Sequence, residues 1–233
     1  MKSISTVPGG IIFLSGSEIE AKRWSREYRN RLIHEELTSL EQVIDLGNLE
    51  LLALRLPDLV GSPLSINSLR LNLQLSHKTV SKWVAILERL YSIVRIPPFG
   101  APQIRAVKKE QKHYHYDWSL ISNLPTRFEN LVAIHLLKWI HFEQDAKGRD
   151  LDLRYFKDVD GREVDFVVTE KLKPIQLIEV KWSDVEISRG LRYLKQRFPE
   201  AYALKVSATG KKDYVTADGI RVLPVIEFLN TLI

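Results

Sequence analysis

The stretch that decides the fold reads Ile175-Gln-Leu-Ile-Glu-Val-Lys-Trp182, an apolar run that carries two charges, Glu179 and Lys181. A similar run, Glu163-Val-Asp-Phe-Val-Val168, lies upstream with Asp165 at its centre. Both runs are typical of buried strands, whose side chains alternate between the two faces of a sheet, so Glu179 and Lys181 share one face. An unpaired buried charge costs on the order of several kcal/mol. We therefore expect these three charged residues to serve a function.

The composition is that of a folded protein with an anionic partner. The chain has 233 residues, enough for one large or two small domains, and 45% of them are hydrophobic. The net charge of +5 favours nucleic acid as the partner. The absence of cysteine excludes disulfides, thiolate metal sites and a cysteine nucleophile. The longest early apolar run, Ile11–Leu14, is too short for a membrane span or a signal peptide, so we expect a soluble, cytoplasmic protein with no membrane partner.

The first part of the chain, over 1–122, predicts a helical domain. Apolar residues recur every three to four positions over 18–46, and a second helix is expected over 49–60. Ser65 and Ser76 are then placed to cap two further helices that a short turn joins. This spacing predicts a helix-turn-helix motif.

The segment that follows the helix-turn-helix predicts strands at 93–96, 103–107 and 113–118. Two helices followed by a β-hairpin form the winged variant of the motif, here over about 49–118. If the second helix entered a major groove, its first residues and the wing would contact DNA. The predicted nucleic-acid-binding residues are Ser76, His77, Lys78, Thr79, Ser81, Lys82, Arg105, Lys108, Lys109 and Lys112. The alternative is a winged helix that packs against protein, with these charges hydrated.

Residues 123–233 predict a second domain of mixed α/β structure. The expected elements are a helix at 126–142, strands at 151–156, 163–168 and 175–182, a helix at 187–197 and a strand at 201–207, with a short strand at 220–223 and a helix at 225–232 behind them. The order α-β-β-β-α-β places Glu179 and Lys181 on the third strand.

The charged residues of these strands suit a divalent-metal phosphodiesterase site. Mg²⁺ prefers oxygen ligands, and Asp165 and Glu179 on adjacent strands can share one ion with the Val180 carbonyl. Lys181 would handle the attacking water or stabilise negative charge. Glu129, on the preceding helix, would be a third carboxylate and metal ligand if that helix packs across the sheet. The expected cofactor is Mg²⁺, with Mn²⁺ as a substitute.

Each of these residues also has a purely structural interpretation. Asp165, Glu179 and Lys181 can form a salt bridge between neighbouring strands. Glu129 stands third after Thr126, which is the spacing of a capping box. Glu163 can be an accessory ligand or a solvated strand end, and Gln196 can be a substrate-orienting amide or a surface residue.

Taken together, Glu129, Asp165 and Glu179-Val-Lys181 on this order of elements resemble the PD-(D/E)XK nuclease superfamily, whose fold is that of restriction endonucleases. The chain is similar to the C-terminal half of prokaryotic AAA-type ATPases of the domain-of-unknown-function 4143 family. The matching stretches are Gly16-Ser-Glu18 through Trp24, Thr79-Val-Ser-Lys-Trp83 to Leu90, Tyr116-Asp-Trp118, Phe128-Glu-Asn130, Arg162-Glu-Val-Asp-Phe166, Ile178-Glu-Val-Lys181 and Val222-Leu-Pro224. The resemblance implies a winged helix followed by a nuclease-like domain, both behind an ATPase.

The sequence departs from that family because it contains no Gly-x-x-x-x-Gly-Lys-Ser/Thr phosphate loop. We therefore expect no ATP site, and a truncated or stand-alone relative of the family. The leading hypothesis is a DNA-binding, nuclease-like protein that hydrolyses the phosphodiester bonds of DNA as a Mg²⁺-dependent deoxyribonuclease. The alternatives are a non-catalytic regulatory or partner-binding module, with a protein partner or an ATPase acting in trans, and a DNA-binding regulator without chemistry.

Overall fold

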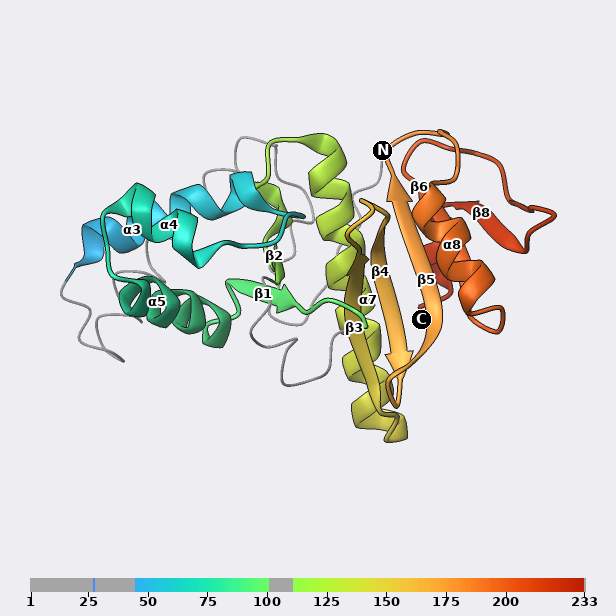
Figure 1. Cartoon of the computed structure of the whole chain (residues 1–233), viewed down its shortest axis with the longest axis horizontal. Coiled ribbons are helices and arrows are strands. Elements are labelled where there is room, and N and C mark those ends of the chain that lie inside the picture. Colours follow the sequence, from blue (N-terminus) through green and yellow to red (C-terminus); the bar gives the residue numbers. More distant parts are fainter. Residues whose placement is uncertain (1–26, 28–44, 101–110, 233) are drawn as a thin grey trace. The chain divides into compact units, whose positions relative to one another are not determined.

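The computed structural model describes residue 27 and residues 45–100 and 111–232, which form two compact units (Figure 1). The first unit comprises the described residues of Met1–Val60, Leu64–Val94 and His115–Ser122. The second comprises those of Gly61–Pro63, Arg95–Tyr114 and Asn123–Ile233. The helix predicted over 18–46 and the strand predicted over 103–107 lie almost entirely outside the described residues.

The first unit contains the two helices of the predicted helix-turn-helix. Helix α4 (Ile66–Leu73) is capped by Ser65 and α5 (His77–Arg89) by Ser76, whose hydroxyl accepts a hydrogen bond from the Thr79 N–H at 3.0 Å. Both caps are the predicted ones. Buried apolar residues of these helices pack with those of α3 (Leu46–Arg55) into one core.

The helix predicted over 49–60 is in fact shorter. Helix α3 ends at Arg55, and the 3-10 helix η2 (Leu56–Leu59) follows it. Pro57 explains the change, because proline has no N–H for the α-helical ladder and disfavours the α conformation in the residue before it.

A small two-stranded sheet follows the helices, formed by β1 (Ile93–Ile96) and β2 (Lys112–His115). The strand predicted to continue to Trp118 ends at His115. Asp117 caps the short 3-10 helix η3 (Trp118–Leu120) instead, since its carboxylate accepts a hydrogen bond from the Ser119 N–H at 3.0 Å. The order of elements agrees with a winged helix, which remains a prediction.

The second unit is built around a mixed six-stranded sheet with the order β3-β4-β5-β6-β8-β7. Strands β3, β4 and β5 are antiparallel, and β5, β6 and β8 are parallel. The elements are α7 (Leu124–Lys147), β3 (Leu151–Lys157), β4 (Glu163–Glu170), β5 (Lys173–Lys181), α8 (Arg189–Arg197), β6 (Tyr202–Ser207), β7 (Tyr214–Val215), β8 (Ile220–Pro224) and α9 (Val225–Asn230). This is the predicted α-β-β-β-α-β order, with the short strand β7 in addition.

Helices α7 and α8 lie on either side of this sheet (Figure 1). Under α8, Leu191 and Leu194 pack on Val164, Val167 and Leu177. Helix α7 runs five residues beyond its predicted end at 142, to a left-handed cap at Gly148 (φ 64°). The sheet therefore presents one end of β4 and β5 beside the first turn of α8, and the candidate site lies there.

Candidate functional site

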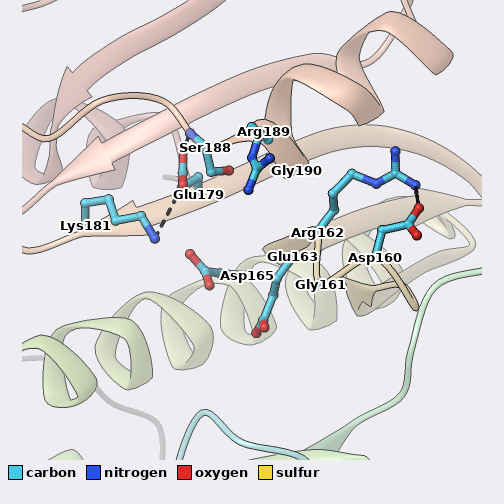
Figure 2. Close-up of a pocket in the computed structure, with 10 residues that line it drawn as sticks. All are labelled: Asp160, Gly161, Arg162, Glu163, Asp165, Glu179, Lys181, Ser188, Arg189 and Gly190. Carbon is cyan, nitrogen blue, oxygen red and sulfur yellow. Dashed lines mark hydrogen bonds and ion pairs between the residues drawn. The ribbon is translucent and has the colours of Figure 1, made fainter.

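A cavity of about 400 Å³ opens at the ends of β4 and β5 (Figure 2). The β3–β4 turn, both strands and the first residues of α8 line it. Asp165, Glu179 and Lys181 are among the lining residues. The structure thus brings three of the four predicted catalytic residues to one cavity, and their catalytic role remains a prediction.

Asp165 reaches this cavity because β4 contains an irregularity. Arg154 of β3 pairs with Val167, but Phe156 pairs with Val164, so β4 has one residue more than β3 between these pairs. Such a bulge re-aims side chains. Val164 and Val167 both pack under α8 in consequence, while Phe166 between them packs against Tyr114 and Asp165 lines the cavity.

The Asp165 carboxylate accepts a hydrogen bond from β5 beyond the last residue pair of β4 and β5, where a backbone carbonyl would otherwise be the acceptor. The pairing of β4 with β5 ends at Phe166 and Ile178, and the next free donor of β5 is the Val180 N–H. This N–H donates a hydrogen bond to Asp165 Oδ2 at 2.7 Å. The bond holds the carboxylate at the point where the two strands separate.

Glu179 is almost fully buried, with 1% of its surface exposed. Its Oε2 accepts a hydrogen bond from the Ser188 N–H at 3.1 Å, immediately before α8. Its Oε1 is buried without a hydrogen-bond donor among the described residues and lies 3.4 Å from Lys181 Nζ. A buried carboxylate oxygen with one distant cation as its partner has capacity for a further ligand.

Lys181 is half-buried between the two carboxylates, and in Figure 2 its ammonium points into the space between Glu179 and Asp165. Burial alone would lower the pKa of Lys181, but the negative charges of Asp165 and Glu179 raise it above its usual value. The side chain is therefore a cation at neutral pH, able to donate hydrogen bonds and unable to accept a proton.

Glu129 makes contacts that neither sequence interpretation foresaw, and its part as a metal ligand remains a prediction. The capping box is wrong, because α7 begins earlier and Asn123 is its cap, accepting a hydrogen bond from the Thr126 N–H at 3.0 Å. Glu129 Oε1 instead accepts a hydrogen bond from the Tyr114 hydroxyl at 2.7 Å and lies 3.7 Å from Lys112 Nζ. It does not line the cavity.

Lys112 must be withdrawn from the predicted phosphate contacts. It is 1% exposed, and its ammonium lies 2.6 Å from Glu163 and 5.4 Å from the centre of the Tyr155 ring. A lysine so buried and so paired cannot reach the phosphate of a nucleic acid at the surface. Glu163, for its part, is more than a solvated strand end, because it also pairs with Lys157 at 3.0 Å.

The remaining predicted nucleic-acid contacts are distributed between the start of α5 and the predicted wing. His77, Lys78 and Lys82 are exposed at the start of α5. The hydroxyls of Ser76 and Thr79 bond to each other at 2.7 Å, and Ser81 lies 3.3 Å from the His77 ring. Arg105, Lys108 and Lys109 lie outside the described residues. DNA contact by these residues remains a prediction.

The sequence analysis overlooked Ser188, Arg189 and Gly190, which line the cavity from the start of α8. The Arg189 guanidinium points into the cavity (Figure 2). A serine placed to cap a helix directly after the Glu-x-Lys strand was the available signal. Gln196, weighed as a substrate-orienting amide, is exposed on α8 and does not line the cavity.

The two carboxylates suit a magnesium ion that keeps most of its water. Within residues 45–100 and 111–232, no group of three or more His, Asp or Glu side chains is arranged to hold a metal ion. Mg²⁺ is commonly held by one or two carboxylates together with waters and substrate phosphates. Asp165 and Glu179, whose Oε1 has no hydrogen-bond donor among the described residues, supply such a pair of carboxylates. The residues present therefore fit a magnesium ion.

Asp165 makes the stability of the metal-free protein depend on pH. Burial, and then the negative charge of Glu129, raise the pKa of its carboxyl to about 7, although Lys112, Lys181 and the Val180 N–H oppose the shift. A folded pKa above the unfolded value of 3.8 favours the folded state at low pH, and this contribution is lost as the pH rises through 7.

We therefore expect the free energy of unfolding in EDTA to fall by about 1 kcal/mol between pH 6 and pH 8 because of Asp165. The Asp165→Asn variant should not show this decrease. Urea unfolding at pH 6, 7 and 8 measures it, with the exposed Asp145→Asn as the control. Parallel pH profiles for the wild type and Asp165→Asn would contradict the expectation.

Comparison with known families gives two matches. Residues 12–131 match a family described as a domain of unknown function (DUF8612), and residues 126–228 match another domain of unknown function (DUF4143). The second match confirms the predicted relation to the 4143 family. No curated protein and no solved structure matches the chain. Among the described helices, none combines the length and the apolar character needed to cross a membrane.

Proposed function

The chain belongs to the DUF8612 family and carries a DUF4143 match, and we propose that this second region is a PD-(D/E)XK-like domain that hydrolyses DNA phosphodiester bonds with Mg²⁺. One observation carries the proposal. Asp165 on one strand and Glu179 and Lys181 on its neighbour line a single open cavity at the place where the strands separate.

Asp165 and Glu179 would hold the ion. Bound Mg²⁺ supplies charge neutralisation at the phosphate and an acidified water. Asp165 Oδ2 is already fixed by the Val180 N–H, and Glu179 Oε2 by the Ser188 N–H, so each carboxylate keeps one oxygen for the ion. These two hydrogen bonds from backbone N–H groups would orient the carboxylates for the ion.

Lys181 would orient the attacking water and stabilise charge on the phosphate. Because the neighbouring carboxylates keep it protonated, it donates a hydrogen bond to the water oxygen and does not remove its proton. Arg189, which points into the same cavity from the start of α8, would bind a non-bridging phosphate oxygen.

The positive net charge of the chain and its exposed basic residues support DNA as the substrate. The net charge of +5 favours a polyanion, and His77 and Lys78 stand exposed at the start of α5, where a helix-turn-helix contacts DNA. We propose that the winged helix holds the duplex and that the site in the second unit cleaves it.

A non-catalytic module is the second candidate, and one observation favours it. Three acidic groups of the cluster already have a cation within the chain, with Lys181 near Glu179 and Lys112 near Glu129 and Glu163. A self-neutralised cluster can be structural. The domain would then serve a protein partner, such as an ATPase that acts in trans.

Metal-dependent cleavage tests the proposal against this alternative. We expect the protein to convert supercoiled plasmid and linear duplex to shorter products in Mg²⁺ or Mn²⁺ but not in EDTA. Glu179→Gln should lose at least about 100-fold in rate, whereas Glu200→Gln, an exposed carboxylate of the same unit, should not.

Equal products from the wild type and Glu179→Gln would assign the cleavage to a contaminant and reject the enzymatic proposal. Retardation of DNA in a gel, without products in any metal, would identify a DNA-binding regulator.

A further inference from the structure

Lys112 is a buried cation to which the proposed chemistry gives no task. Its ammonium contacts Glu163 at 2.6 Å and Glu129 at 3.7 Å. Asp165 is close enough for its charge to raise the pKa of Lys112 together with those of Glu129 and Glu163, against the lowering effect of burial. The Lys112 ammonium thus pairs with two carboxylates directly and is influenced by the charge of a third, Asp165, which also belongs to the proposed Mg²⁺ site.

Carboxylate oxygens gathered around one cation are also the kind of ligand that a second divalent ion would need. Two-metal phosphodiesterases place their ions about 3.5–4 Å apart and share a carboxylate between them. Burial raises the pKa of Asp165, and the positive charges of Lys112 and Lys181 both act against that shift, so both ammoniums act electrostatically on this carboxylate. Glu129 and Glu163 pair with Lys112 directly.

The surrounding residues are fitted to the ammonium. The Tyr114 hydroxyl bonds Glu129 Oε1 and directs that carboxylate, and the Tyr155 ring lies 5.4 Å from Lys112 Nζ. Gly61 leaves the room for Glu129, since a Cβ on it would lie 3.2 Å from Oε1. Tyr114 and Gly61 thus fix the orientation of the Glu129 carboxylate. A carboxylate fixed in this way indicates a defined role for the Lys112 ammonium beside it.

From these contacts we infer that Lys112 is a positioning residue whose ammonium occupies the place of a second metal ion, so that the site takes a single divalent ion. The inference rests on the proposed function, because it assumes an ion at Asp165 and Glu179. It also means that residues matched by DUF8612 complete a site whose other members lie in the DUF4143 match.

Counting bound Mn²⁺ tests this directly, with the full chain titrated and free Mn²⁺ measured by electron paramagnetic resonance. We expect one bound ion in the wild type and none in Glu179→Gln. Lys112→Met should bind two ions. Lys157→Met is the matched control, because Lys157 also pairs with Glu163 but from an exposed position, and it should bind one. Lys112→Arg, which keeps the cation, should also bind one.

Thermal melting gives a second readout. Because Lys112→Met leaves two carboxylates without their ammonium, its melting temperature should fall in EDTA and recover with Mn²⁺ more than that of the wild type. A Lys112→Met chain that stays unfolded in saturating Mn²⁺ would overturn the inference, since a divalent ion must be able to replace the ammonium.

The outcomes separate this inference from the proposed function. One bound ion in both the wild type and folded Lys112→Met, or two in the wild type, would overturn the inference and leave the metal site intact. No bound ion in the wild type would overturn the proposed function and the inference together.

Discussion

Replacing Lys181 with alanine is expected to lower the rate of DNA cleavage at least about 100-fold at saturating Mg²⁺. The ammonium is held at 3.4 Å from Glu179 and is kept charged by Glu179 and Asp165. A fixed charge in a partly buried site stabilises a transition state more than a hydrated one does. Single-turnover cleavage of a labelled duplex measures the loss in the chemical step.

Lys173→Ala is the control for this prediction. Lys173 lies on the same strand, β5, but it is exposed at the opposite end and outside the cavity. Its replacement should leave the rate unchanged. Urea unfolding must accompany the assay, because Lys181→Ala also removes a partner of the buried Glu179. Full activity in folded Lys181→Ala would remove Lys181 from the mechanism.

Gly190→Ala is expected to destabilise the protein by at least about 2 kcal/mol. A Cβ on Gly190 would lie 2.8 Å from the backbone nitrogen of Glu163 and closer still to its carbonyl oxygen. Backbone atoms of a paired strand cannot move aside, so the overpacking exceeds the roughly 1 kcal/mol that alanine gains over glycine in a helix. Chemical unfolding gives the value.

Gly47→Ala provides the comparison, because Gly47 also lies in the first turn of a helix and a Cβ on it would meet nothing within 4 Å. It should be neutral or slightly stabilising. Because Gly190 and Glu163 both line the cavity, Gly190→Ala should also weaken the binding of Mn²⁺. Equal stabilities of the two alanine variants would refute the close packing of α8 on β4.

The order of helices and strands along the second unit could be predicted because its signals are local. The Glu-x-Lys strand, the apolar strand before it and the helix after it each have their own periodicity, and the helix caps at Ser65 and Ser76 follow from adjacent residues. The errors at Pro57 and at Thr126 concern helix ends, which local patterns define poorly: α3 ends at Arg55, and α7 is capped by Asn123 instead of Thr126.

The charge partners of the site could not be predicted, because they depend on contacts between distant segments. Lys112 has the sequence context of an exposed basic wing, and only the folded chain places it against Glu163. The bulge at Asp165 likewise has no sequence signal in β4, since it is defined by the pairing with β3. Alternation along one strand cannot reveal an extra residue relative to its partner.

The pairing of Gly61 with His113 and of Pro63 with Lys112 has a practical consequence for dissecting this protein. A recombinant fragment that began at Asn123 would contain the whole α-β-β-β-α-β order and still lack the ammonium that neutralises its acidic cluster. Truncation at that point would remove Lys112, the cation that pairs with both Glu129 and Glu163, and Tyr114, which donates a hydrogen bond to Glu129. A fragment that keeps every segment of this unit has to begin no later than Gly61.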